Sequence, residues 1–147
     1  MAIDRKATTV WQGDLQSGKG EFTLDSSQVG GTFAVSAPAR FEEQARPQTS
    51  PEELIAAAHS SCFSMALSNI LGKGGHAPER LETSAVVTIE RQEGGFQIMK
   101  SALTLRASVP GISREDFRAA TEQAKAGCPV SKALAGGLEI TLDASLV

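Results

Sequence analysis

Residues 54–72 contain no Asp, Glu, Lys or Arg, and this uncharged stretch limits most strongly what the chain can fold into. The residues before it mark a helix start, because Ser50 can cap the helix, Pro51 takes the first helical position and Glu53 completes a capping box. Glycines at positions 72, 74 and 75 predict that the helix ends at about residue 71. The stretch reaches membrane-spanning length, but it is rich in Ala and Ser and contains His59. We therefore expect a long helix buried inside a soluble protein.

The rest of the composition fits one globular domain. The chain has 147 residues, of which 41% are hydrophobic and 21% charged, so we expect a single domain over residues 1–147 and exclude a disordered chain. A net charge of −3 without a basic cluster argues against a nucleic-acid partner and against an acidic membrane surface. The N-terminal residues lack the apolar segment of a secretory signal, and we expect a cytoplasmic protein.

Strand-like and helix-like segments occur in clusters along the sequence. Alternating or β-branched runs predict strands, and a charged, proline-rich stretch at 37–50 predicts a functional loop. A serine cap at Ser113 and a proline at Pro129 predict two further helices. The predicted strands cover residues 7–14, 20–25, 31–36, 81–93, 103–109 and 138–146. Because strands and helices are clustered, we predict an α+β fold with antiparallel strands around the long helix.

Two cysteines, Cys62 and Cys128, are the most informative reactive residues. Cys62 lies within the long helix, where a free cysteine often serves only as a small apolar residue. Cys128 stands between Gly127 and Pro129 at a predicted helix start, where backbone N–H groups stabilise a thiolate. Such a pair suits peroxide reduction, in which one thiolate becomes a sulfenic acid and the other thiol closes a disulfide. Packing roles for both cysteines remain the alternative.

A cysteine thiolate at neutral pH needs a nearby cation, because an apolar site raises the pKa of a thiol. The candidates are Arg40 and Arg46 in the predicted loop, and His59. An arginine is the better partner, since it is always charged and can also bind a carboxylate. Glu52 is the freer candidate for that carboxylate, because Glu53 already has a capping role.

The spacing of Glu52 and Cys62 constrains how they can share a site. Ten residues of straight helix separate two positions by about 15 Å and about 80° of rotation. The two residues can therefore serve one site only if the helix is broken, if a long arginine bridges them, or if Glu52 comes from another subunit. The last possibility implies a homodimer with sites at its interface.

His59 lies three residues before Cys62, on the same face of the predicted helix. We favour a hydrogen-bonded core histidine over a general base for the thiol. A zinc site with Cys62 and Cys128 would lack a convincing fourth ligand. Hydrolase chemistry by Cys62 and His59 is a further alternative, and it would not need Cys128.

Several segments resemble the osmotically induced protein C / organic hydroperoxide resistance family. The resemblance is carried by SPEELIAAAHSSCFSMALS at 50–68 and KAGCPVS at 125–131, with further similarity at 11–14, 18–20, 40–42 and 109–112. It covers nearly the whole chain, and the sequence around Cys62 is more similar to the osmotically induced branch of the family. The loop before Pro51 is a residue or two longer than in the family, so Arg46 rivals Arg40, and Ser50 replaces the usual asparagine.

The resemblance implies a Cys-based peroxidase for organic hydroperoxides, built as an intertwined α+β homodimer with two interfacial sites. By correspondence, Cys62 would be the peroxidatic cysteine and Cys128 the resolving one, while Arg40 would activate the Cys62 thiolate and Glu52 would orient Arg40. The family uses no bound metal, haem or flavin, and an external dithiol, possibly a lipoylated protein, reduces the disulfide. Within the long helix, Phe63, Met65 and Leu67 could line an apolar substrate site.

The sequence thus predicts a thiol-dependent peroxidase that acts in oxidative or osmotic stress. It would reduce organic hydroperoxides to alcohols through a Cys62 sulfenic acid and an intramolecular disulfide with Cys128. The alternative is a non-catalytic stress protein that binds a small apolar ligand at the dimer interface, with both cysteines as packing residues.

Overall fold

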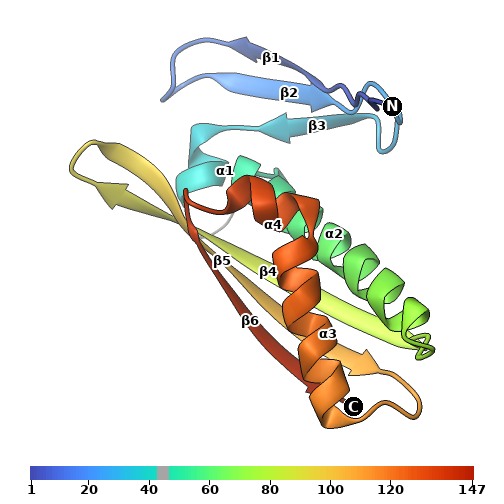
Figure 1. The fold of residues 1–147 in the computed structure, drawn as a ribbon. Helices are drawn as coiled ribbons and strands as arrows, with labels where there is room; N and C mark the ends of the chain where they lie inside the picture. Colours follow the sequence, from blue (N-terminus) through green and yellow to red (C-terminus); the bar gives the residue numbers. More distant parts are fainter. Residues whose placement is uncertain (43–46) are drawn as a thin grey trace. The chain divides into compact units, whose positions relative to one another are not determined.

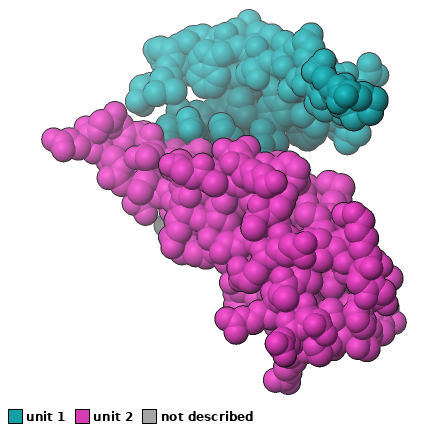
Figure 2. Space-filling view, in the orientation of Figure 1, with its two compact units in different colours: residues 1–54 teal, residues 55–147 magenta. Residues whose placement is uncertain are grey.

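The computed structural model describes residues 1–42 and 47–147 of the chain (Figure 1). These residues fall into two compact units, Met1–Leu54 and Ile55–Val147, which Figure 2 distinguishes by colour and which we describe separately. The single domain expected from the length stays a prediction.

Unit 1 is built on an antiparallel sheet of three short strands. Strands β1 (Thr8–Gln12), β2 (Lys19–Thr23) and β3 (Thr32–Val35) lie in the order β1-β2-β3 and confirm the three strands predicted there. Phe22 and Phe33 stack across β2 and β3 with ring centroids 5.1 Å apart. The next segment was predicted to be a loop but forms a short helix, α1 (Ala37–Phe41). A local signal for α1 exists, because Ser36 caps it and a proline occupies its first turn.

Unit 2 contains the second sheet and most of the helical residues. Strands β4 (Arg80–Gln92) and β5 (Gly95–Ser108) form the predicted antiparallel hairpin, and β6 (Glu139–Leu146) pairs with β5. The β5–β6 pair is parallel, which corrects the expectation of antiparallel pairing throughout. Helices α3 (Arg114–Gly127) and α4 (Pro129–Leu134) form the crossover that a parallel pair requires. The α+β class itself is confirmed.

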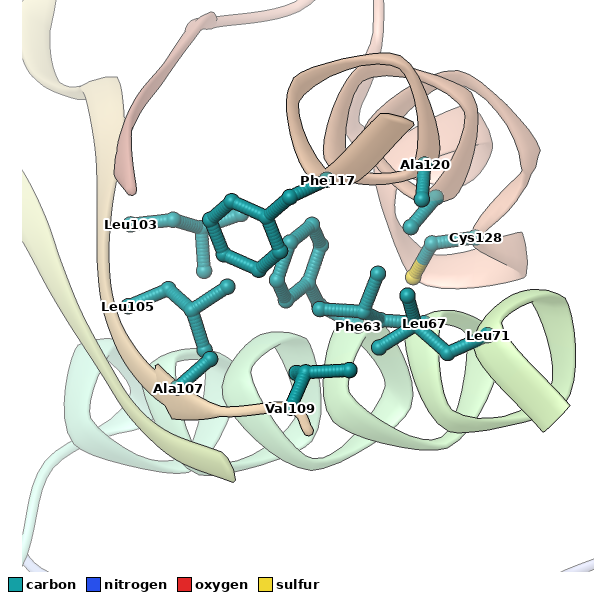
Figure 3. Packing of buried hydrophobic residues seen from close by; sticks show 11 residues of the cluster. Phe63, Leu67, Leu71, Leu103, Leu105, Ala107, Val109, Phe117, Ala120 and Cys128 are labelled. Atoms are coloured by element: carbon teal, nitrogen blue, oxygen red, sulfur yellow. The ribbon is translucent and has the colours of Figure 1, made fainter. Parts of the chain in front are cut away.

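The core of unit 2 lies between this sheet and two helices. Helix α2 (Pro51–Lys73) and α3 lie on the same face of the sheet (Figure 1), and their apolar side chains meet those of β5 (Figure 3). The fully or almost fully buried members include Phe63, Leu67 and Leu71 from α2, Leu103 and Leu105 from β5, and Phe117 and Ala124 from α3. This packing fixes which residues of α2 point into the unit.

Helix α2 has the predicted start and length, but within the chain only one side of it is buried. His59, Phe63, Leu67 and Leu71 form the buried stripe, whereas the side chain of Met65 is 66% exposed. The expectation of a fully buried helix was therefore wrong for the isolated chain, because the sheet and α3 cover one face only. By length and composition α2 could also cross a membrane, but the core helix of a soluble protein passes the same test.

Candidate active site

The two cysteines, 66 positions apart in the sequence, meet inside unit 2. Cys62 lies half-buried on α2, and Cys128 is completely buried between α3 and α4. Both are free thiols, and the side chains form a hydrogen bond in which Cys62 is the donor. The contact brings together two thiols from distant parts of the sequence.

Cys128 owes its position to the junction of two helices. Its backbone N–H donates to the carbonyl of Ala124 at 2.8 Å and closes α3, and Pro129 starts α4 at the next residue. The sharp junction turns the side chain inward, so that its sulfur points toward α2 beside Leu67 (Figure 3). The sequence Gly-Cys-Pro thus places a thiol at a helix start and in the core at once.

The two thiols differ in how readily they ionise. Burial raises the pKa of Cys62, and the hydrogen bond to Cys128 raises it further. Burial also opposes ionisation of Cys128, but hydrogen bonds from the backbone N–H of Ser131, from Cys62 and from the Ser131 hydroxyl hold its pKa below the ordinary value. Within unit 2, therefore, the surroundings favour ionisation of Cys128 over that of Cys62, and a cation near Cys62 would counter its raised pKa.

Unit 1 holds the other predicted pair, Arg40 and Glu52. Arg40 lies in the last turn of α1, and its Nη2 donates to Oε1 of Glu52 at 2.8 Å, while its Nε donates to the two carboxylate oxygens at 3.1 and 3.3 Å. The Glu52 side chain is 8% exposed and the Arg40 side chain 36%. Such a fork between guanidinium and carboxylate fixes the direction of the guanidinium group. Arg46, the rival to Arg40, lies outside the described residues.

The structure therefore places the four predicted residues as two contacting pairs, one in each unit. Helix α2 is continuous from Pro51 to Lys73, which removes a broken helix as a way for Glu52 and Cys62 to share a site. The neighbouring Glu53 has half of the predicted capping box. Its N–H donates to Ser50 Oγ at 3.2 Å, but its carboxylate accepts from the Thr49 hydroxyl at 2.6 Å.

His59 is a hydrogen-bonded core histidine, as the sequence analysis favoured, but its two partners were not predicted. Its Nδ1 is 2.7 Å from the Ser101 hydroxyl oxygen, and its Nε2 is 2.8 Å from that of Ser131. All three side chains are almost completely buried, and burial lowers the pKa of His59, which favours the neutral imidazole. The sequence could have pointed to Ser131, because it follows Cys128, at the predicted helix start, by three residues and so lies near it on the helix. Ser101, on β5, had no such signal.

The predicted apolar lining of a substrate site needs correction. Phe63 and Leu67 are completely buried in the core, so they cannot face a substrate, and only Met65 of the three is exposed. Phe63 and Leu67 are four residues apart and share the core face of α2, whereas Met65, between them in the sequence, lies on the exposed side. Among the residues that the structure describes, no three His, Cys, Asp or Glu side chains are grouped so as to hold a metal ion.

Comparison with known proteins identifies the class. Residues 43–143 match the family model described as OsmC-like protein, and the chain belongs to this family. It is 42% identical to peroxiredoxin OsmC of Escherichia coli over 146 residues, which covers 99% of each chain. It is also 32% identical to the organic hydroperoxide resistance protein OhrA of Bacillus subtilis over 95 residues, covering 65% of this chain and 66% of the relative.

A solved structure supports the same assignment. An organic hydroperoxide resistance protein from Elizabethkingia anophelis, crystallised with a thiocyanate ion bound, superimposes with a TM-score of 0.78 at 28% identity. The match covers 100% of this chain and 99% of that one. The α+β arrangement described above is therefore that of proteins with this name.

Proposed function

We propose that the protein is a thiol-dependent peroxidase that reduces organic hydroperoxides, with Cys62 as the peroxidatic and Cys128 as the resolving cysteine. The contact between the two thiols carries this proposal, because packing alone does not require two cysteines from distant segments to meet. The names of the relatives, a peroxiredoxin and organic hydroperoxide resistance proteins, support a peroxidase role in stress defence.

Exposure supports the assignment of the two roles. Cys62 is half-buried, whereas Cys128 has no exposed surface, so Cys62 is the thiol that a peroxide would meet first. In the first step the Cys62 thiolate attacks one peroxide oxygen, the O–O bond breaks, and the departing alkoxide takes up a proton and leaves as alcohol. In the second step the Cys128 thiolate attacks the Cys62 sulfenic acid. The S–O bond breaks, hydroxide takes up a proton to become water, and a disulfide remains.

Arg40 and Glu52 supply what the cysteine pair lacks in this proposal. The raised pKa of Cys62 means that a cation is needed to shift the negative charge onto its sulfur. Arg40 would provide that cation and would stabilise the charge on the departing oxygen, while Glu52 holds its guanidinium in one orientation. An external dithiol, such as that of a lipoylated protein, would reduce the disulfide and complete the cycle.

A homodimer is part of the proposal, and the exposed side of α2 supports it. Five of its exposed residues recur at alternating spacings of three and four, which is the pattern of a helix-packing seam, and none of the five is charged: Ala58, Ser61, Met65, Ser68 and Gly72. Small residues in such a seam allow two helices to approach closely. A second copy of the chain would cover this face, and Glu52 of one subunit could then serve Cys62 of the other.

Intact mass spectrometry tests the reaction directly. The fully reduced protein is treated with one equivalent of cumene hydroperoxide, alongside the variant Cys128→Ser. We expect the wild type to lose the mass of two hydrogens and the variant to gain the mass of one oxygen. If neither mass changes, the cysteines are packing residues, and the protein is better described as a binder of small apolar ligands.

A further inference from the structure

A chain of hydrogen bonds runs from β5 through α2 to the buried sulfur of Cys128. It starts at the Ser101 hydroxyl, passes through both ring nitrogens of His59 and reaches the Ser131 hydroxyl. The Ser131 hydroxyl and the Ser131 backbone N–H both interact with the Cys128 thiol. The members come from β5, α2 and α4, and none of the three side chains has more than 4% of its surface exposed.

The donor and acceptor inventory permits one arrangement that favours a thiolate. A serine hydroxyl has a single proton, so Ser131 can donate to Cys128 only if it accepts from Nε2–H of His59. A neutral imidazole with its proton on Nε2 has Nδ1 as acceptor, and that nitrogen then accepts from the Ser101 hydroxyl. In this arrangement the Ser101 hydroxyl, Nε2–H of His59 and the Ser131 hydroxyl all donate in the direction of the Cys128 sulfur. In the opposite arrangement the Ser131 proton points at His59, and the thiol keeps its proton.

We infer that His59 is a positioning residue, which orients the Ser131 hydroxyl toward Cys128 and so prepares the resolving cysteine to attack the Cys62 sulfenic acid. The inference rests on the proposed function for the role of Cys128, and it assigns His59 no contact with the peroxide. It gives a reason for a completely buried histidine next to a cysteine pair. In the second step the Ser131 hydroxyl then donates to the Cys128 sulfur as its thiolate attacks the Cys62 sulfenic acid.

The Ser131 hydroxyl acts beside other groups at Cys128, because the Ser131 backbone N–H and the Cys62 thiol both lower the Cys128 pKa more than the hydroxyl does. On α2 the titratable neighbours are Cys62 and His59 itself. The residues that face Cys128 from β5 and α3 belong to the apolar core. Ser131 also lines a surface cavity. The charged residues of α3 and α4 that line the same cavity are Glu122, Lys125 and Lys132. His59 stays neutral because burial lowers its pKa, so its influence on Cys128 does not depend on an imidazolium ion.

Thiolate absorbance in the ultraviolet measures the pKa of Cys128 without any reagent reaching it. In a Cys62→Ala background Cys128 is the single cysteine, and the chain has no tyrosine to interfere at high pH. We expect Ser131→Ala to raise the Cys128 pKa by about one unit, equivalent to a tenfold loss of thiolate at a pH below both values. Ser101→Ala is the matched control, because it also removes a serine hydroxyl that is hydrogen-bonded to His59, but the one farther from Cys128. It should change the pKa by less than half as much, and equal shifts in the two variants would overturn the inference.

A second measurement needs no substitution of His59, Ser101 or Ser131, in case Ser131→Ala fails to fold. The chain has two histidines, so nitrogen NMR of the reduced protein with His76→Gln reports on His59 alone. We expect a neutral ring with its proton on Nε2. A proton on Nδ1 at a pH where Cys128 is ionised would refute the proposed direction of these hydrogen bonds.

Single-turnover kinetics with cumene hydroperoxide separate the inference from the proposed function. Ser131→Ala should slow disulfide formation about tenfold near neutral pH without slowing sulfenic acid formation at Cys62. A general structural disturbance would slow both steps, and equal slowing would count against the inference. If the wild type does not react with peroxide, the proposed function fails, whereas the absorbance and NMR measurements still decide the role of His59.

Discussion

Replacing Glu52 by glutamine tests the Arg40–Glu52 pair against a matched neighbour. Glu52 is buried and accepts three hydrogen bonds from Arg40, whereas Glu53 is exposed and accepts one from Thr49. Both lie in the first turn of α2, so Glu52→Gln and Glu53→Gln each remove one negative charge near the helix N-terminus. The helix-dipole contribution therefore cancels when the two variants are compared.

The size of the difference follows from the geometry of the pair. A hydrogen bond to a charged group contributes about 1.5–3 kcal/mol when buried. The glutamine keeps one oxygen that can accept from Arg40, and the Arg40 side chain is 36% exposed, so solvent screens part of the interaction. We expect Glu52→Gln to lower the free energy of unfolding by about 1–2 kcal/mol more than Glu53→Gln does. That corresponds to a difference in Tm of about 2–8 °C for a chain of this size.

Urea unfolding of both variants at one protein concentration measures this difference. The same samples are then tested for the rate of Cys62 oxidation by cumene hydroperoxide, which should fall about tenfold or more in Glu52→Gln and stay unchanged in Glu53→Gln. If both variants lose the same stability, the Arg40–Glu52 contact does not stabilise the fold. If Glu52→Gln loses stability but keeps the wild-type rate, the pair is structural and plays no part in activating Cys62.

Three further expectations follow from the structure. Arg40→Lys should oxidise more slowly than the wild type despite its retained charge, because a lysine cannot form the fork with Glu52; equal rates would show that charge alone is enough. Phe63→Ala should cost about 3–5 kcal/mol in urea unfolding, since its side chain is completely buried. Met65→Ala, two residues along, should cost far less in a monomer, and a cost near that of Phe63→Ala would indicate that a second copy covers Met65. The free energy of unfolding should decrease as the pH falls below about 6.5, because the unfolded chain binds a proton at His59 that the folded chain, with its lowered pKa, does not. His59→Gln should flatten this pH dependence, and an unchanged slope would place its origin elsewhere.

Local sequence determined the secondary structure of this protein. The start of α2 follows from Ser50 and Pro51, the start of α3 from Ser113, and the β4–β5 hairpin from its alternating residues, since each signal acts between residues a few positions apart. The motifs around Cys62 and Cys128 also led to the correct family. Contacts between distant segments were decided by the tertiary structure alone. The parallel pairing of β6, the meeting of the two thiols and the cluster of His59 with Ser101 and Ser131 depend on how α3 and α4 pack back onto α2 and β5. Burial along α2 was misjudged for the same reason, because a helix of small uncharged residues does not itself specify which of its faces the sheet covers.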